Sequence, residues 1–197
     1  SRFEFRVAAE DQTVTKPEDD VLRHVDKHPN SMGALTLGLM SDEIGGIRGA
    51  IEAARAGRIK AGVLIYFKPL VPRPTDAEAE ALVAELIDAL EYSVVLASHK
   101  ADFLKKASVV LPVAAWSEEE GTYTNYQGRV QMAGKAINPG GDIQPVWEVF
   151  ASLLYASGDK TLWLSADDVF ARMSESIPAF KNSSPDQTRQ PAALRTP

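Results

Sequence analysis

Apolar residues form three short runs in the middle of the chain, and helical patterns separate them. The runs cover residues 59–67, 92–97 and 108–112 and are rich in Val, Ile and Leu, which is typical of strands buried on both faces of a parallel sheet. Apolar residues recur at i, i+3, i+4 and i+7 over 75–90, and a short helix is expected over 100–107. This alternation predicts an α/β, Rossmann-like three-layer domain with a mostly parallel sheet.

Further elements are predicted on either side of these runs. Alternating apolar residues at 3–7 predict a half-buried N-terminal strand. Helical spacing with suitable end residues predicts three more helices: one at 47–54 capped by Gly57, one beginning at Pro145 and closed by Gly158, and one opened by Ser165 and Asp168 and ended by Pro178. Residues 113–141 show no period and are predicted to form a long irregular excursion, a kind of segment that often carries function.

These patterns divide the chain into three segments. Residues 1–30 are expected to form an N-terminal strand and loop, and residues 31–178 the α/β domain with its trailing helices. Residues 179–197 are polar and interrupted by prolines, so we expect a flexible tail.

Composition narrows the chemistry that the chain can perform. The 197 residues include no cysteine and only three histidines, which excludes disulfides, thiolate nucleophiles and cysteine-held zinc or iron–sulfur sites. The net charge of −6 argues against binding nucleic acid, and no apolar run approaches the roughly 20 residues that span a bilayer. The chain begins at Ser1 without an initiator Met, so we expect a piece of a longer protein.

Candidate sites built from polar residues have plainer structural explanations, which we favour. Neither G-x-G-x-x-G nor the P-loop pattern occurs. His24 and His28 have metal-ligand spacing for a helix, but Pro29 follows directly and a solvated loop is the better explanation. His99, just past a strand, is expected to be a surface or supporting histidine, and the acidic run 118–120 a solvated turn.

The excursion contains a long signature. Residues 107–131 read ASVVLPVAAWSEEEGTYTNYQGRVQ and resemble the molybdopterin oxidoreductase superfamily, whose pattern runs ADVVLP and then E-x-x-GT-[FY]-x-N-x-EGR-x-Q. Residues 26–34 resemble its D-K-x-PN-x-x-GA segment, and residues 57–61 resemble the G-K-I-K-A that leads into a strand of its third domain. The resemblance extends over residues 20–175 and implies the fold of that third domain, followed by C-terminal helices.

Departures from the family pattern distinguish two kinds of member. Where the family has Gly-x-[ND]-Pro, which lets backbone approach a pterin guanine dinucleotide, this chain has Tyr-Phe-Lys-Pro at 66–69. The family's Thr-Glu-Thr is Ala-Asp-Phe at 101–103, and the Glu of EGR is Gln127. Two helices and a tail follow the signature, whereas a molybdoenzyme needs a further closing domain. The resemblance therefore favours the large iron–sulfur subunit, of the G type, of NADH-quinone oxidoreductase.

This resemblance implies a structural and docking role. No cofactor is expected in this chain, and iron–sulfur clusters are expected in the missing N-terminal part of the large subunit. The expected partners are that N-terminal part and other subunits of the peripheral arm of complex I, on the cytoplasmic side of the inner membrane, with no nucleic acid and no direct membrane insertion. The alternative is a domain of a divergent molybdenum-pterin oxidoreductase such as a formate dehydrogenase.

The same resemblance names candidate cofactor-binding positions in the signature loop, with no catalytic or metal-binding residue. These family loop positions are Gly121, Thr122, Asn125, Gly128 and Arg129. The guanidinium of Arg129 either binds a phosphate or carboxylate or holds the loop through carbonyl groups, and we favour the second role.

Overall fold

The structure is a computed structural model that describes residues 30–39, 46–67, 76–125, 127–181 and 183–189. Three features expected from the sequence lie outside these ranges: the strand at 3–7, the pair His24 and His28, and the last part of the tail at 190–197.

The chain divides into two units, which are described separately. Residues 41–119 and 135–163 form the sheet unit. Residues 1–40, 120–134 and 164–197 form the hairpin unit.

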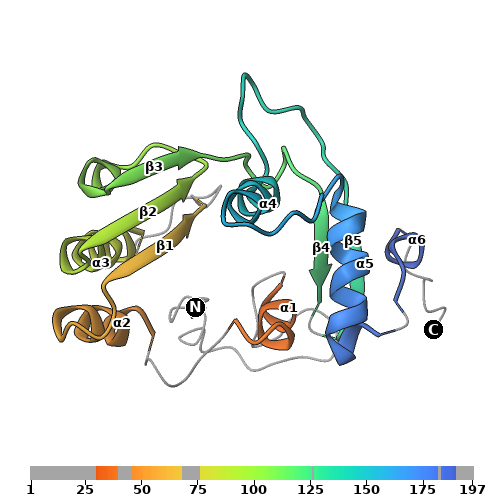
Figure 1. Ribbon diagram of the computed structural model, residues 1–197, viewed down its shortest axis with the longest axis horizontal. Helices are drawn as coiled ribbons and strands as arrows, with labels where there is room; N and C mark the ends of the chain where they lie inside the picture. Colours follow the sequence, from red (N-terminus) through yellow and green to blue (C-terminus); the bar gives the residue numbers. More distant parts are fainter. Residues whose placement is uncertain (1–29, 40–45, 68–75, 126, 182, 190–197) are drawn as a thin grey trace, which may run out of the picture. The chain divides into compact units, whose positions relative to one another are not determined.

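The sheet unit contains three parallel strands in the order β1-β2-β3 (Figure 1). Strand β1 (Ala61–Tyr66) pairs with β2 (Tyr92–Ala97), and β2 pairs with β3 (Val109–Pro112). Helix α3 (Asp76–Ala89) connects the first two strands, and a short 3-10 helix, η2 (Asp102–Lys106), connects the second and third. The predicted α/β fold with a parallel sheet is confirmed, although the second connection is shorter than the helix expected over 100–107.

Helices cover both faces of the sheet, but not equally. On one face Val95 and Ala97 pack with Ile87 of α3 and Phe103 of η2, and helix α2 (Gly46–Arg55) packs against α3. On the other face Leu96 packs with Val113 and with Val149 of helix α4 (Val146–Ala156). Val95 and Leu96 are both completely buried, so β2 lies at the centre of a three-layer arrangement.

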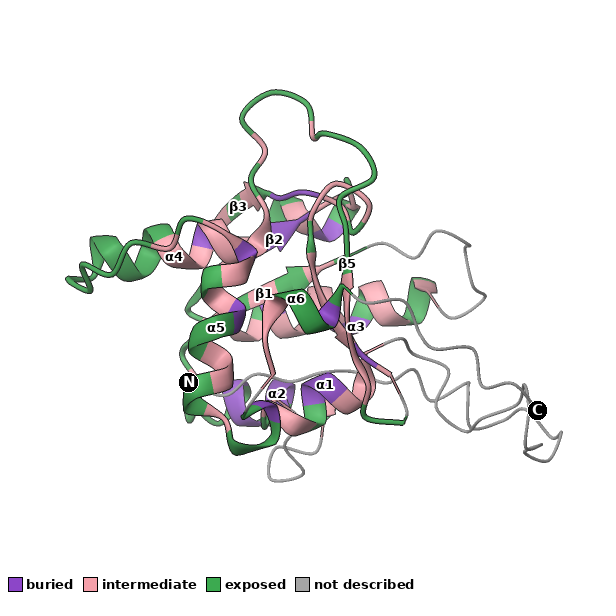
Figure 2. Cartoon of the chain, turned by 90° about the vertical axis from the view of Figure 1, so that its right-hand side faces the viewer, coloured by how far each residue is buried: buried purple, intermediate pink, exposed green. Residues whose placement is uncertain are grey.

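Two expectations about burial are wrong in the sheet unit. Strand β1 is not buried on both faces, since Val63 and Ile65 are each 44% exposed. The spacing of apolar residues in α4 predicts one inward face made of Val146, Val149, Phe150, Leu153 and Leu154, but Leu153 and Leu154 are each 45% exposed, and Figure 2 shows this end of α4 as exposed. The helix ends agree with the sequence, because Gly57 and Gly158 adopt φ angles of 71° and 111°, which favour glycine at C-terminal caps.

The hairpin unit corrects the prediction of an irregular excursion. Strands β4 (Gly121–Thr124) and β5 (Val130–Ala133) form an antiparallel hairpin. The other elements of the unit are α1 (Ser31–Thr36), α5 (Ala166–Ser176), the 3-10 helix η3 (Pro178–Phe180) and α6 (Pro185–Thr188). Helix α5 begins at Ser165, whose hydroxyl accepts a hydrogen bond from the Asp168 N–H, as its sequence predicts.

Part of the segment expected to be a flexible tail forms a helix. Helix α6 begins with a capping box between Ser184 and Gln187. Thr188 is buried, and the Arg189 guanidinium binds both carboxylate oxygens of Asp167 on α5 at 2.8 and 2.9 Å. These contacts attach residues 184–189 to α5.

No helix in the described ranges combines the length and apolar character needed to cross a membrane.

The position of Leu96 between the sheet and α4 gives a test of the fold. Replacing Leu96 by Ala should lower the free energy of unfolding by about 2–5 kcal/mol, because the cavity cannot collapse between two packed layers. Leu162→Ala is the matched control, since Leu162 is 70% exposed and its truncation should change stability by less than about 0.5 kcal/mol. Urea unfolding followed by circular dichroism measures both, and equal small effects would contradict this packing.

Candidate functional site

The family loop positions are parts of the β4–β5 hairpin. The side-chain oxygen of Asn125 accepts hydrogen bonds from the backbone N–H groups of Gln127 and Arg129, at 3.0 and 2.9 Å. The Asn125 N–H donates to the Arg129 carbonyl at 2.9 Å, and the Gly128 N–H donates to the Asn125 carbonyl. Gly128 has a φ of 78°, which disfavours any other residue. Asn125 and Gly128 therefore shape the turn that joins the strands.

The remaining loop positions, Gly121, Thr122 and Arg129, contribute to the hairpin through their backbone groups. Thr122 pairs with Met132 across the hairpin, and Gly121 pairs with Ala133. A Cβ atom added at Gly121 would meet nothing within 4 Å, so packing among the described residues does not require glycine there. The role of the Arg129 side chain stays a prediction, while its backbone closes the hairpin through both its N–H and its carbonyl group.

A second family segment contacts this hairpin. The side-chain oxygen of Asn30 accepts a hydrogen bond from the buried Thr124 N–H at 2.8 Å. The Asn30 carboxamide lies where a Cβ atom at Gly33 would be, so the first turn of α1 must have glycine at that position. In the sequence these residues belong to two separate motifs, and in the structure one hydrogen bond joins them.

Two departures from the family pattern meet at the carboxyl ends of β1 and β2. Tyr66, the last residue of β1, contacts Phe103 edge to face with ring centroids 4.9 Å apart, and Phe103 is 5% exposed. The Tyr66 hydroxyl donates a hydrogen bond of 2.6 Å to the Glu80 carboxylate on α3. Burial, followed by the interaction with Glu80, raises the pKa of Tyr66 well above its ordinary value, so the hydroxyl keeps its proton.

The N-terminus of α3 is acidic. Asp76 and Glu78 lie in its first turn, and the Glu78 carboxylate pairs with Arg48 of α2 at 3.0 Å. A helix N-terminus attracts anions through its free N–H groups and its dipole. Carboxylates in the first turn of α3 complement the helix dipole and disfavour a further anion, such as a phosphate, at this end.

The acidic run 118–120 is not a uniformly solvated turn, which corrects the prediction made for it. The Glu118 carboxylate accepts from the Ala115 N–H at 2.8 Å, and the Glu119 carboxylate accepts from the Val146 N–H at 3.4 Å, at the start of α4. Burial raises the pKa of Glu119, and the hydrogen bond from Val146 partly offsets this rise. Glu120 is exposed. The sequence signal is the helix start at Pro145, which leaves N–H groups in need of an acceptor.

Other candidate groups remain apart from one another. His99 is exposed, and its Nδ1 lies 2.9 Å from the hydroxyl of the adjacent Ser98, which agrees with a surface histidine. Within the parts of the chain that the structure describes, no three His, Asp or Glu side chains are grouped so that they could hold a metal ion.

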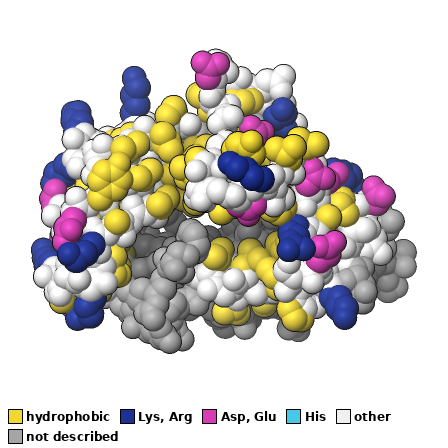
Figure 3. All heavy atoms as spheres, in the orientation of Figure 1, with side chains coloured by type: hydrophobic (Ala, Val, Ile, Leu, Met, Phe, Trp, Pro, Cys, Tyr) yellow, Lys and Arg dark blue, Asp and Glu magenta, His cyan; other side chains and the backbone are white. Residues whose placement is uncertain are grey.

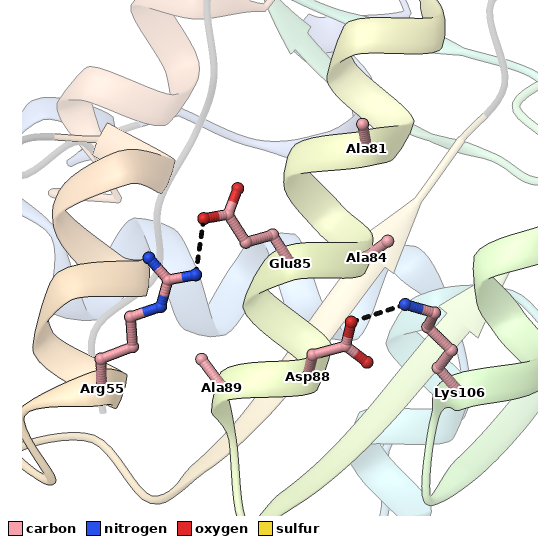
Figure 4. Close-up of a pocket in the computed structure, with 7 residues that line it drawn as sticks. All are labelled: Arg55, Ala81, Ala84, Glu85, Asp88, Ala89 and Lys106. Carbon is pink, nitrogen blue, oxygen red and sulfur yellow. Dashed lines mark hydrogen bonds and ion pairs between the residues drawn. The ribbon is translucent and has the colours of Figure 1, made fainter.

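A shallow pocket lies on the outer surface of α3, between α2 and η2. Its floor is formed by Ala81, Ala84 and Ala89 of α3, and two ion pairs flank it (Figure 4). These pairs join Arg55 to Glu85 at 2.9 Å and Lys106 to Asp88 at 2.5 Å. The charges are balanced within the protein, and the pocket extends toward the C-terminal end of α3, away from the carboxyl ends of the strands where ligands of such sheets bind.

The contact between Asn30 and Gly33 gives a double-mutant test. Gly33→Ala should destabilise the protein by about 1 kcal/mol, because the new methyl group displaces the Asn30 carboxamide from the Thr124 N–H. In the background of Asn30→Ala the same change should be neutral or stabilising, since alanine favours a helix over glycine by up to about 1 kcal/mol. Thermal unfolding of the four proteins measures the coupling, and additive effects would show that the contact is absent.

Glu119 gives a pH test. The pKa of Glu119 is raised in the folded protein, so ionisation of this carboxyl group lowers the free energy of unfolding. The loss of stability develops as the pH rises through the folded-state pKa of Glu119. Glu119→Gln keeps an acceptor for the Val146 N–H without a charge to bury. The variant should be more stable than the wild type near neutral pH, and the difference should disappear in acid. Urea unfolding over a pH series measures this, with Glu120→Gln as a control for the loss of one charge, and a constant difference would contradict the prediction.

Comparison with known proteins assigns the chain to a family. The molybdopterin oxidoreductase family model matches residues 10–156. The F420-dependent formate dehydrogenase 2 subunit alpha of Methanococcus maripaludis is 34% identical over 130 residues, which are 64% of this chain and 19% of that protein. The F420-dependent formate dehydrogenase subunit alpha of Methanocaldococcus jannaschii is 30% identical over 158 residues, 79% of this chain and 21% of that protein.

A shorter match relates the chain to an NADH-quinone oxidoreductase protein. The G-type NADH-quinone oxidoreductase protein of Rickettsia bellii is 31% identical over 77 residues, 39% of this chain and 11% of that protein. The chain thus spans about a fifth of the length of the first two relatives. Because the family model matches most of its residues, this chain belongs to the molybdopterin oxidoreductase family.

Proposed function

We propose that the chain is a structural and docking domain, without a pterin cofactor of its own, in the large iron–sulfur protein of an NADH-quinone oxidoreductase, of the G type. The observation that carries this proposal is the contact between Tyr66 and Phe103 at the carboxyl ends of β1 and β2.

The aromatic pair occupies positions where the family resemblance places groups that receive a cofactor. Glycine at position 66 would let backbone approach a pterin guanine dinucleotide, whereas the side chain of a tyrosine at that position would crowd this approach. A hydroxyl at position 103 could donate a hydrogen bond to a ligand, whereas Phe103 is apolar and buried. Because the two replacements contact each other, they are complementary parts of a protein core and a poor fit for a bound dinucleotide.

Charge at the same edge supports the proposal. The first turn of α3 carries Asp76 and Glu78, and Glu80 accepts the hydrogen bond from Tyr66. A dinucleotide brings two phosphate charges, which are bound most readily at a helix N-terminus free of carboxylates. Phosphate binding at α3 would therefore require burial of like charges close together.

In this proposal the redox chemistry takes place elsewhere in the parent protein. The chain has no cysteine, so the iron–sulfur clusters that carry electrons from NADH toward quinone would be held by the N-terminal part of that protein. The domain would support that part and contact other subunits of the peripheral arm, at the cytoplasmic side of the inner membrane. The hairpin turn at 125–129 would serve the fold through its backbone contacts.

A domain of a molybdenum-pterin oxidoreductase such as a formate dehydrogenase is the second candidate. It is favoured by the match to the Methanocaldococcus jannaschii protein, which covers 79% of this chain against 39% for the Rickettsia bellii relative. In that case the signature loop with Asn125, Gly128 and Arg129 would contact the cofactor.

The two candidates predict different amounts of metal and of bound nucleotide in the full-length protein. We expect molybdenum and tungsten far below stoichiometric amounts by elemental mass spectrometry, and no guanine nucleotide released on denaturation, together with iron and acid-labile sulfide. A known molybdoenzyme purified in parallel controls for loss of cofactor. Stoichiometric molybdenum or tungsten with a released pterin would overturn the proposal and support the formate dehydrogenase type.

A further inference from the structure

The last described segment of the hairpin unit follows a firm anchor in the core of that unit. The anchor is Phe180 of η3, which is buried and contacts the buried Phe170 of α5 edge to face, with ring centroids 6.4 Å apart. Two buried aromatic rings in contact contribute strongly to local stability. The chain beyond Phe180 therefore starts from a fixed point.

Residues 183–189, which we call the C-terminal strap, have much less buried surface than this anchor. Thr188 is the only buried residue of the strap. Its hydroxyl donates to the Pro185 carbonyl at 2.6 Å, and the capping box between Ser184 and Gln187 satisfies other polar groups within α6. Because a helix of four residues is unstable in isolation, α6 depends on its contacts with the rest of the unit.

The C-terminal strap packs against strand β5 and helix α5. Three of the four residues of β5 are half-buried, and Ala133 is exposed. With Thr188 as its only buried side chain, the strap gains little from apolar contact. Figure 3 shows acidic and basic side chains interspersed on its right-hand side, over α5. The attachment of the strap must therefore depend largely on charge.

One ion pair fastens the end of the strap. The Arg189 guanidinium donates to both carboxylate oxygens of Asp167, at 2.8 and 2.9 Å. These hydrogen bonds raise the pKa of Arg189, and the charges of Glu120 and Asp186 add to this effect. The two paired side chains are 42% and 38% exposed, so solvent and salt reach the pair. An ion pair of this kind contributes modestly to stability and weakens as the salt concentration rises.

We propose that the C-terminal strap is a reversible cover for β5, anchored at Phe180 and fastened by the ion pair between Arg189 and Asp167. While the pair is formed, α6 lies on β5. When the pair separates, the strap lifts, α6 unfolds and β5 becomes accessible to solvent. The proposal does not rest on the proposed function, because it concerns only contacts within the hairpin unit.

Opening of the strap affects the signature loop, because the turn at 125–129 joins β5 to β4. Local opening of this kind requires only the loss of the few contacts that hold a segment, and it occurs while the rest of the domain stays folded. Ionic strength, and anions that compete for the guanidinium of Arg189, would thus control access to one strand of the signature hairpin.

The test is amide hydrogen exchange of the full-length protein, read by mass spectrometry, with Arg189→Ala. We expect peptides from 183–189 to exchange on the order of fivefold faster than in the wild type. Peptides from β5 should exchange about twofold faster, because β5 remains paired with β4. Arg172→Ala is the matched control, since Arg172 forms an exposed ion pair with Glu175 on α5, and this variant should exchange like the wild type.

Two further measurements identify the ion pair as the fastening. Arg189→Lys keeps the charge but holds a carboxylate less well, so its exchange should lie between that of the wild type and that of Arg189→Ala. Raising sodium chloride from about 0.05 M to about 1 M should bring the wild type close to Arg189→Ala at the same salt concentration.

Three results would overturn the proposal. Unchanged exchange over 183–189 in Arg189→Ala would show that the ion pair does not fasten the strap. Equal acceleration over the strap and over α5 would show that the hairpin unit opens as a whole. Faster exchange of the strap with unchanged exchange of β5 would show that the strap is not a cover for that strand.

Discussion

The burial of β2 between two helical layers is the constraint on which the sheet unit depends. Val95 packs toward α3 and η2, Leu96 packs toward α4, and neither is accessible to solvent. Parallel pairing on both sides of β2 requires connections that cross the sheet, and α3 and η2 are those connections. The positions of the strand ends, and thus of Tyr66 and Phe103, follow from this arrangement.

Local patterns in the sequence are sufficient to predict the parallel sheet and most of its helices, because runs such as 92–97 are apolar enough to specify a central strand. They do not predict the β4–β5 hairpin, since its strands are four residues each and are too short for an apolar alternation to stand out from the Gly and Thr residues around it. Its stability depends on the turn at Asn125 and on Asn30, and a contact between residues so far apart in sequence has no local signal. The burial of Glu119 escapes prediction because the helix start at Pro145 shows that an acceptor is needed but not which residue supplies it.

The candidate site illustrates what a family signature can and cannot specify. The signature puts Asn125 and Gly128 in one loop, and in the structure both residues shape the hairpin turn; it also identifies Tyr66 and Phe103 as departures from the pattern. It does not indicate that these two aromatic residues contact each other. Because Tyr66 and Phe103 contact each other, the two departures form one structural change. Together they say more than either residue alone about whether this edge of the sheet can bind a ligand.

The hydrogen bond from Thr124 to Asn30 joins residues 94 positions apart, and it has a consequence for the order of folding during synthesis. The hairpin unit is assembled from three separated stretches of chain, of which the last includes α5 and α6. Strands β1 to β3 leave the ribosome earlier and are close together in sequence, so the entropy lost on closing their loops is smaller. The sheet should therefore form first, and the hairpin unit should remain incomplete until the ribosome has translated the segment that contains Arg189.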